Sequence, residues 1–117
     1  MFKKILIIDD DQDMLEMLKD MLSEEGHIVR GYSYTDDIFI LIAQETPDLL
    51  IVDYLINGLN GGEICSAVKR NPATAHLPVM ILTGYDRVIR SLGDYSADRV
   101  IYKPFELNDL LSAVKSL

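Results

Sequence analysis

The sequence predicts one doubly wound α/β domain, in which helices cover both faces of a five-stranded parallel sheet. Short apolar runs rich in Ile and Val recur along the chain, and segments of helical periodicity separate them. Strands that alternate with helices form parallel sheets with right-handed crossovers. The length of 117 residues fits a single domain spanning residues 1–117, without a linker, an internal repeat or a low-complexity segment.

Four predicted strands are runs of four residues, apolar throughout except for Arg99 in the last run, and such runs are the pattern of strands that are buried on both faces of a sheet. They cover residues 5–8, 49–52, 79–82 and 99–102. A weaker candidate, residues 27–31, is interrupted by polar side chains, and we therefore expect it at an edge of the sheet.

Five helices are predicted between and after these strands, because apolar residues recur there at spacings of three or four. Gly26 is expected to close the first helix and Thr35 to cap the second, which must stop before Pro47. Asn71-Pro72 should end the third. The five apolar stripes are Leu15, Leu18 and Leu22; Ile38, Leu41 and Ile42; Ile64 and Val68; Val88, Ile89 and Leu92; and Leu107, Leu110, Leu111, Val114 and Leu117.

The composition excludes several classes of protein. With 11 Lys and Arg against 19 Asp and Glu, the formal net charge is −8, which argues against direct binding to nucleic acid or to an anionic membrane. The single cysteine, Cys65, makes no intrachain disulfide, and no Cys/His cluster has zinc spacing. The apolar run after Met1 is too short for a signal peptide, so we expect a cytoplasmic domain.

Polar residues stand where the predicted strands end. Asp9 and Asp10 follow the first strand, while Asp53, Thr83 and Lys103 follow the last three strands in the chain. In a parallel sheet the carboxyl ends of the strands lie at one edge, where such folds place their functional sites. We therefore expect all five side chains to converge.

These residue types suit phosphoryl chemistry. Three carboxylates brought together repel one another unless a positive charge neutralises them, and Mg²⁺ binds such groups together with water and phosphate oxygens. An ammonium and a hydroxyl complete a site for a phosphoryl group bonded to a carboxylate.

Together, these elements resemble the receiver domain of response regulators in two-component signalling. The resemblance rests on Asp9-Asp10, residues 53–63, Leu82-Thr83-Gly84 and Lys103-Pro104-Phe105, which occur in the family's order across nearly the whole chain. It implies a flavodoxin-like fold with strand order 2-1-3-4-5, similar to the chemotaxis regulators of the family.

The resemblance also implies a role for each residue at the sheet edge. Asp53 would be the phosphoacceptor and, with Asp10, Asp9 and the backbone carbonyl of Leu55, would hold Mg²⁺. Asp10 would bind the ion directly and Asp9 mostly through water.

Four further features of the site follow from the resemblance. Thr83 would hydrogen-bond the phosphoryl group, and Lys103 would pair with it. Gly84 would leave room for that group, and the Lys103-Pro104 bond is expected to be cis.

The sequence departs from the family pattern at three places. Asn57 stands where the family has a proline, and the spacing from Thr83 to Lys103 is short, which indicates a trimmed fourth helix. Val100 occupies the position of the family's switch aromatic. Tyr102 lies beside Lys103, and we expect it on the opposite face of the strand from Val100.

The implied function is a Mg²⁺-dependent switch that accepts a phosphoryl group from a sensor histidine kinase or a phosphotransfer protein. It turns over no separate substrate, so we do not expect an enzyme. A receiver-like interaction module that works without phosphate is an alternative. The cognate kinase, the output and the oligomeric state do not follow from the sequence.

The acidic run from Asp9 also matches two other motifs less well. An EF-hand loop is disfavoured because Met14 stands where its turn needs glycine. A Mg²⁺-dependent phosphatase of the haloacid-dehalogenase type is disfavoured by Asp13 and by the short chain.

Overall fold

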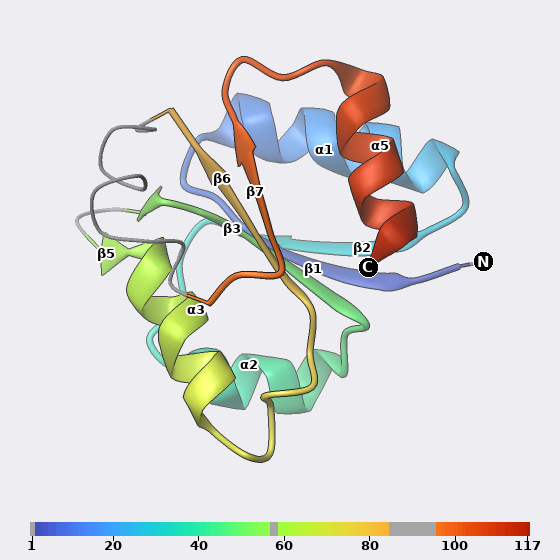
Figure 1. Cartoon of the computed structure of the whole chain (residues 1–117). Helices are drawn as coiled ribbons and strands as arrows, with labels where there is room; N and C mark the ends of the chain where they lie inside the picture. The colour runs from blue at the N-terminus through green and yellow to red at the C-terminus, as the bar shows by residue number, and fades with distance from the viewer. Residues whose placement is uncertain (1, 57–58, 85–95) are drawn as a thin grey trace.

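The sheet has the predicted parallel topology. The computed structural model describes residues 2–56, 59–84 and 96–117. Five parallel strands lie in the order β2-β1-β3-β6-β7, which is 2-1-3-4-5 when only the strands of this sheet are counted (Figure 1). Their bounds are β1 Lys4–Ile8, β2 Ile28–Tyr32, β3 Leu49–Asp53, β6 Val79–Thr83 and β7 Arg99–Tyr102. The predicted fold class and strand order are thereby confirmed, including the edge position of β2.

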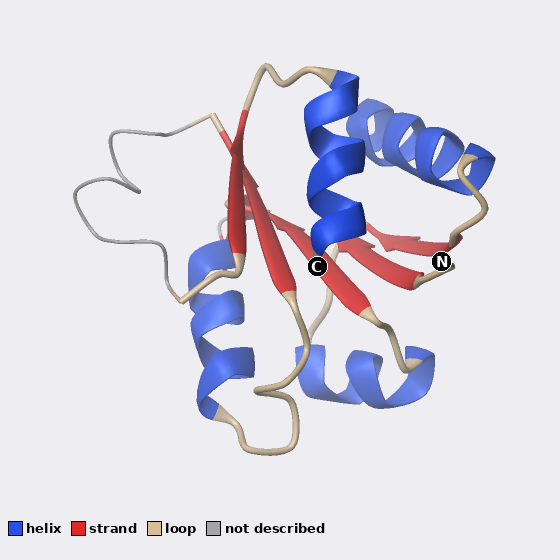
Figure 2. Ribbon diagram, turned by 45° about the vertical axis from the view of Figure 1, so that its right-hand side comes forward, coloured by secondary structure: helices blue, strands red, loops and turns tan. Residues whose placement is uncertain are grey.

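Helices cover both faces of the sheet, as Figure 2 shows. α1 (Gln12–Glu24) and α5 (Leu107–Ser116) pack on one face, and α2 (Ile38–Glu45) and α3 (Gly61–Arg70) pack on the other. Four helices thus lie within the described residues. The predicted helix carrying Val88, Ile89 and Leu92 falls at residues 85–95, outside them.

The core explains why the strand runs are apolar without alternation. Along β1, Ile5 and Ile7 pack toward α1 and α5, whereas Leu6 and Ile8 pack toward α2 and α3. Successive side chains of a strand point to opposite faces, so both sets need an apolar partner layer. The same division holds in β3 and β6, so apolar side chains cover both faces of the central strands.

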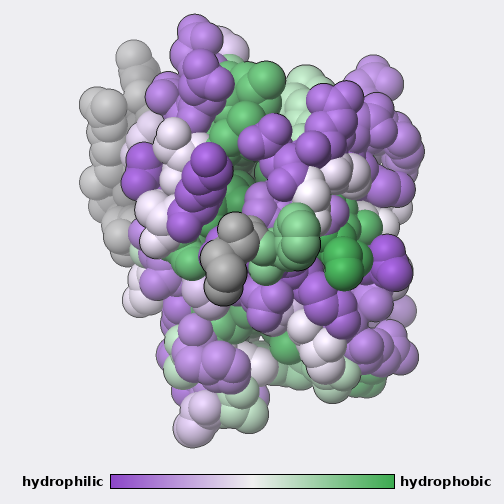
Figure 3. Space-filling model, turned by 90° about the vertical axis from the view of Figure 1, so that its right-hand side faces the viewer, coloured by the Kyte–Doolittle hydropathy of each residue, from purple (hydrophilic) through white to green (hydrophobic). Residues whose placement is uncertain are grey.

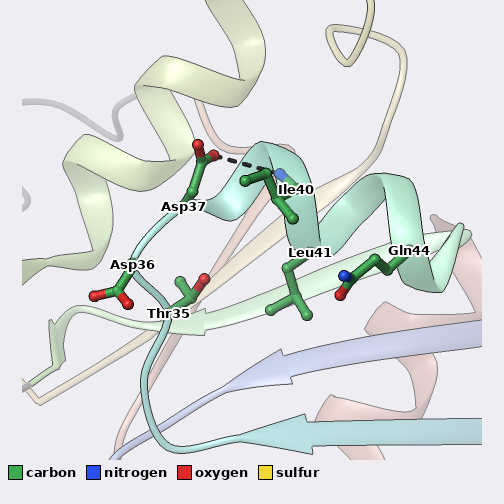
Figure 4. A pocket seen from close by; sticks show the side chains of 6 residues that line it. All are labelled: Thr35, Asp36, Asp37, Ile40, Leu41 and Gln44. Atoms are coloured by element: carbon green, nitrogen blue, oxygen red, sulfur yellow. Dashed lines mark hydrogen bonds between the residues drawn. The ribbon is translucent and has the colours of Figure 1, made fainter.

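The helix ends are set by side chains that accept backbone hydrogen bonds. Asp11 caps α1 by accepting from the backbone N–H of Asp13 at 3.0 Å, and Gly26 follows the helix at a φ of 95° that favours glycine. The predicted Thr35 cap of α2 is wrong, because the helix begins three residues later. Asp37 caps it instead and accepts from the backbone N–H of Phe39 at 2.9 Å and from that of Ile40 at 3.3 Å, the second of which Figure 4 draws.

A short antiparallel pair that the sequence did not predict lies between β3 and α3. β4 (Leu55–Ile56) and β5 (Leu59–Asn60) have two residues each, too few for a periodic signal. Asn60 ends the pair and caps α3 by accepting from the backbone N–H of Gly62 at 2.7 Å. The pair therefore connects the carboxyl end of β3 directly to the start of α3.

Across the part of the chain that the structure describes, no helix combines the length and the apolar character needed to cross a bilayer.

Candidate functional site

The three predicted carboxylates meet at the carboxyl edge of the sheet. Asp9 and Asp10 follow β1, and Asp53 ends the adjacent strand β3, whose Val52 pairs in register with Ile8. One carboxylate oxygen from each of the three residues lies within 4.8 Å of the others. The parallel register of two neighbouring strands thus produces a compact acidic cluster.

Asp9 is the most buried member of this cluster, with no exposed surface. Its Oδ1 accepts a hydrogen bond from the backbone N–H of Asp11 at 2.9 Å. Its Oδ2 is buried without a hydrogen-bond partner among the described residues. Burial, with a smaller contribution from the charge of Asp53, raises the pKa of Asp9 to about 6. A buried carboxylate oxygen without a partner is costly, so this atom favours a cation.

Asp53 pairs with Lys103 across the site. Lys103 Nζ donates to Asp53 Oδ1 at 2.8 Å, and the two side chains are 24% and 13% exposed. Burial raises the pKa of Asp53, and the ammonium of Lys103 opposes that rise. The Lys103-Pro104 peptide bond is cis, as expected. Asp53 therefore faces solvent on a small part of its surface while an ammonium already holds one of its oxygens.

Thr83 lies at the end of β6, fully buried and paired in register with Tyr102 of β7. Its carbonyl accepts from the backbone N–H of Lys103 at 2.7 Å, so the two residues are tied together through the main chain. A Cβ atom on Gly84 would meet no described atom within 4 Å. Among the described residues, nothing fills the space at that position, and the role of Gly84 stays a prediction.

Gly61 is needed for close packing behind Asp53. A Cβ atom there would overlap the backbone carbonyl of Asp53 and crowd Tyr54. The backbone N–H of Gly61 donates to the Tyr54 carbonyl at 2.6 Å, which draws the start of α3 against the end of β3. This steric requirement depends on two segments that meet only in the folded chain.

The donor set fits a hard divalent cation. Three carboxylates within reach of one point, one of them with a buried oxygen that lacks a protein donor, match the oxygen-rich, anionic environment that Mg²⁺ prefers. Leu55 lies in β4, two residues after Asp53, and its carbonyl as a ligand stays a prediction.

β7 corrects one expectation about the switch position. Val100 packs partly toward α2 and α3, whereas Ile101 packs toward α1 and α5. Because side chains two residues apart share a strand face, Tyr102 lies on the face of Val100. The expectation that they occupy opposite faces is therefore wrong, and an exposed aromatic ring stands on that face beside Lys103.

A separate cavity of about 270 Å³ lies at the start of α2 (Figure 4). It is lined by Thr35, Asp36, Asp37, Ile40, Leu41 and Gln44, and it shares no residue with the acidic cluster.

The fold and the acidic edge define the class of the protein, a flavodoxin-like α/β domain with a candidate metal site at its strand ends. A family model for the response regulator receiver domain matches residues 5–115, and the chain belongs to this family. Membership places it in two-component signal transduction.

Three relatives illustrate the likeness. The phosphate regulon transcriptional regulatory protein PhoB of Rhizobium meliloti (strain 1021) is 31% identical over 120 residues, which cover all of this chain and 52% of PhoB. The receiver domain of a signal transduction histidine kinase from Syntrophus aciditrophicus is 32% identical with a TM-score of 0.86, over 97% of this chain and 88% of that one.

The third relative, response regulator TrrA of Thermotoga maritima in complex with Mg²⁺ and BeF, is 26% identical with a TM-score of 0.86. The match covers 97% of each chain. The chain thus spans about half the length of the curated relative and nearly all of the two structural ones.

Proposed function

We propose that this domain is a Mg²⁺-dependent switch that accepts a phosphoryl group on Asp53. The observation that carries the proposal is the pairing of Asp53 with Lys103 at 2.8 Å, next to two further carboxylates at the same sheet edge. A carboxylate that is partly exposed, held by an ammonium and set beside a candidate metal site can act as a nucleophile toward phosphorus.

The transfer step balances with a phosphohistidine donor. A carboxylate oxygen of Asp53 attacks the phosphorus, forming a P–O bond while the P–N bond to the donor imidazole breaks. The bonding electron pair returns to the imidazole nitrogen, which then takes a proton. Asp53 must be ionised to attack, and the ammonium of Lys103 favours its ionised form.

The neighbouring residues stabilise the transferred group. When bound by Asp9, Asp10, Asp53 and the Leu55 carbonyl, Mg²⁺ supplies positive charge that offsets the charge of the carboxylates and of the phosphoryl oxygens. Lys103 pairs with a phosphoryl oxygen, and the Thr83 hydroxyl donates to another.

The partner in this proposal is a sensor histidine kinase or a histidine phosphotransfer protein. The complex of TrrA with Mg²⁺ and BeF supports binding of this ion and of an anion by a domain of this fold. The chain modifies itself and turns over no separate substrate, and it acts in the cytoplasm, where such kinases hold their phosphohistidine. The downstream output is a further domain or a separate protein, and this domain itself makes no direct contact with nucleic acid.

The test is incubation with Mg²⁺ and acetyl phosphate, followed by mass spectrometry of the intact protein. We expect the wild type to gain one phosphoryl group and Asp53→Asn to gain none. Asp20→Asn, which changes an exposed carboxylate of α1, is the matched control and should behave as the wild type. An unmodified wild type would favour the interaction module, and steady release of inorganic phosphate would favour a phosphatase. Equal modification of Asp53→Asn would assign the nucleophile to another residue.

A further inference from the structure

A second group of charged side chains lies at the opposite edge of the sheet, where the strands begin. Lys3 precedes β1, Glu25 and His27 lie between α1 and β2, and Lys115 lies in the last turn of α5. These four residues line a cavity of about 300 Å³. Figure 3 views this side of the molecule, on which hydrophilic and hydrophobic residues are interspersed. The five residues of β1 separate it from the acidic cluster by about 17 Å.

The charge of this cavity is opposite to that of the chain. Lys3 and Lys115 are cationic, His27 becomes cationic on protonation, and Glu25 is the one acid among the four, although the whole chain carries −8. Burial and then the charge of Lys3 lower the pKa of His27, with an opposing effect from Glu25 and a smaller lowering effect from Lys115. The imidazole therefore lies in a net positive field.

The backbone holds the two half-buried residues of the cavity in place. Lys3 donates its backbone N–H to His27 Nδ1 at 3.1 Å, and the Lys3 carbonyl accepts from the backbone N–H of Ile28 at 2.9 Å. Lys3 Nζ donates to the carbonyl of Leu117 at 2.9 Å, which uses one of its three protons. Because Nδ1 of His27 accepts, the neutral ring carries its proton on Nε2 and presents a donor there.

We propose that this cavity is a binding site for a small oxyanion with at least two negative charges. Two ammonium groups and an imidazole N–H supply the donors that phosphate and carboxylate groups accept from, and charged donors give the stronger hydrogen bonds. The two ammonium groups outnumber the single carboxylate of Glu25, and because the attraction grows with the charge of the ligand, a multiply charged oxyanion gains more than a singly charged one. The volume is at the lower end for small-molecule sites and admits a phosphorylated or polycarboxylic compound.

The site has a built-in reporter, because an anion bound beside His27 must raise the pKa of its imidazole. Linkage makes the effect reciprocal: an anion that raises the pKa of His27 binds more tightly to the protonated ring. The experiment is an NMR titration of the His27 ring protons in metal-free Asp53→Asn protein, with inorganic phosphate and citrate as probes and chloride at matched ionic strength. The Asp53→Asn background makes the result independent of phosphorylation at the other edge.

We expect saturable shifts of the His27 resonances with phosphate, citrate or both, and a rise in the pKa of His27. The affinity should fall at least fivefold in Lys3→Met and in Lys115→Met. Lys4→Met is the control, since Lys4 lies next to Lys3 in the chain but donates from Nζ to Thr46 Oγ1 at 3.1 Å.

Binding of phosphate alone would identify a phosphoryl ligand, and binding of citrate alone a carboxylate ligand. Shifts that chloride reproduces at the same ionic strength would overturn the proposal. So would an affinity unchanged in Lys115→Met, whose exposed side chain can be replaced without disturbing the fold.

Discussion

Replacing Asp9 with Asn should stabilise the metal-free protein at neutral pH, although it removes a residue of the candidate site. The folded state raises the pKa of Asp9 from 3.8 to about 6. Between these values the folded protein keeps a proton that the unfolded chain has released, so the free energy of unfolding falls as pH rises. A difference of about two pKa units corresponds to about 3 kcal/mol in the free energy of unfolding. The wild type loses this stability as the pH rises to 6, whereas Asp9→Asn retains it because the amide does not ionise.

Urea unfolding of both proteins at pH 4, 5 and 7.5 measures this effect. We expect a small difference at pH 4, where Asp9 is protonated, and an advantage of about 3 kcal/mol for Asp9→Asn at pH 7.5. Added Mg²⁺ should stabilise the wild type and have less effect on Asp9→Asn, because ligand binding to the folded state raises its stability. The control Asp20→Asn should follow the wild type in pH dependence. If Asp9→Asn is no more stable than the wild type at pH 7.5 without metal, then burial of the charged Asp9 carboxylate does not destabilise the folded protein.

Three further predictions concern the same edge of the sheet. Asp10→Asn should weaken Mg²⁺ binding at least tenfold by calorimetry, because one carboxylate charge leaves the cluster; equal affinity would exclude Asp10 as a ligand. Gly61→Ala should cost about 1–3 kcal/mol in urea unfolding through overlap with the Asp53 carbonyl, whereas Gly84→Ala should leave the stability unchanged; equal losses would contradict this account of Gly61. Lys103→Met should slow modification by acetyl phosphate at least tenfold, a barrier increase of about 1.4 kcal/mol, and an unchanged rate would remove Lys103 from the reaction.

The strands could be predicted from sequence because their signal is local. Four-residue apolar runs such as those in β1 and β3 are needed wherever both faces of a strand are covered, and the structure buries all four residues of each run. The ends of the helices are harder to predict from sequence. Thr35 and Asp37 are both residue types that cap helices well, and Asp37 caps α2 because the folded chain begins the helix at Ile38. The β4–β5 pair was missed because two-residue strands carry no periodicity.

The residues of the candidate site could also be identified from sequence, because each one follows a strand whose direction the fold class sets. Parallel strands bring Asp9, Asp53, Thr83 and Lys103 to one edge whatever the details of packing. Tyr102 shares the strand face of Val100 because side chains alternate with a period of two, and the packing of Val100 and Ile101 on opposite sides of β7 shows which face that is.

The sequence by itself thus determined the fold class, the strand order through its family motifs, and the chemical groups at the sheet edge. The tertiary structure decided how deeply those groups are buried and which other groups they contact. The burial of Asp9 Oδ2, the 2.8 Å contact from Lys103 to Asp53 and the steric need for Gly61 all depend on distances between segments far apart in the chain. The cavity lined by Lys3, Glu25, His27 and Lys115 also depends on folding. Lys115 lies more than 80 positions from the other three residues in sequence, so their charges interact only once the chain has folded.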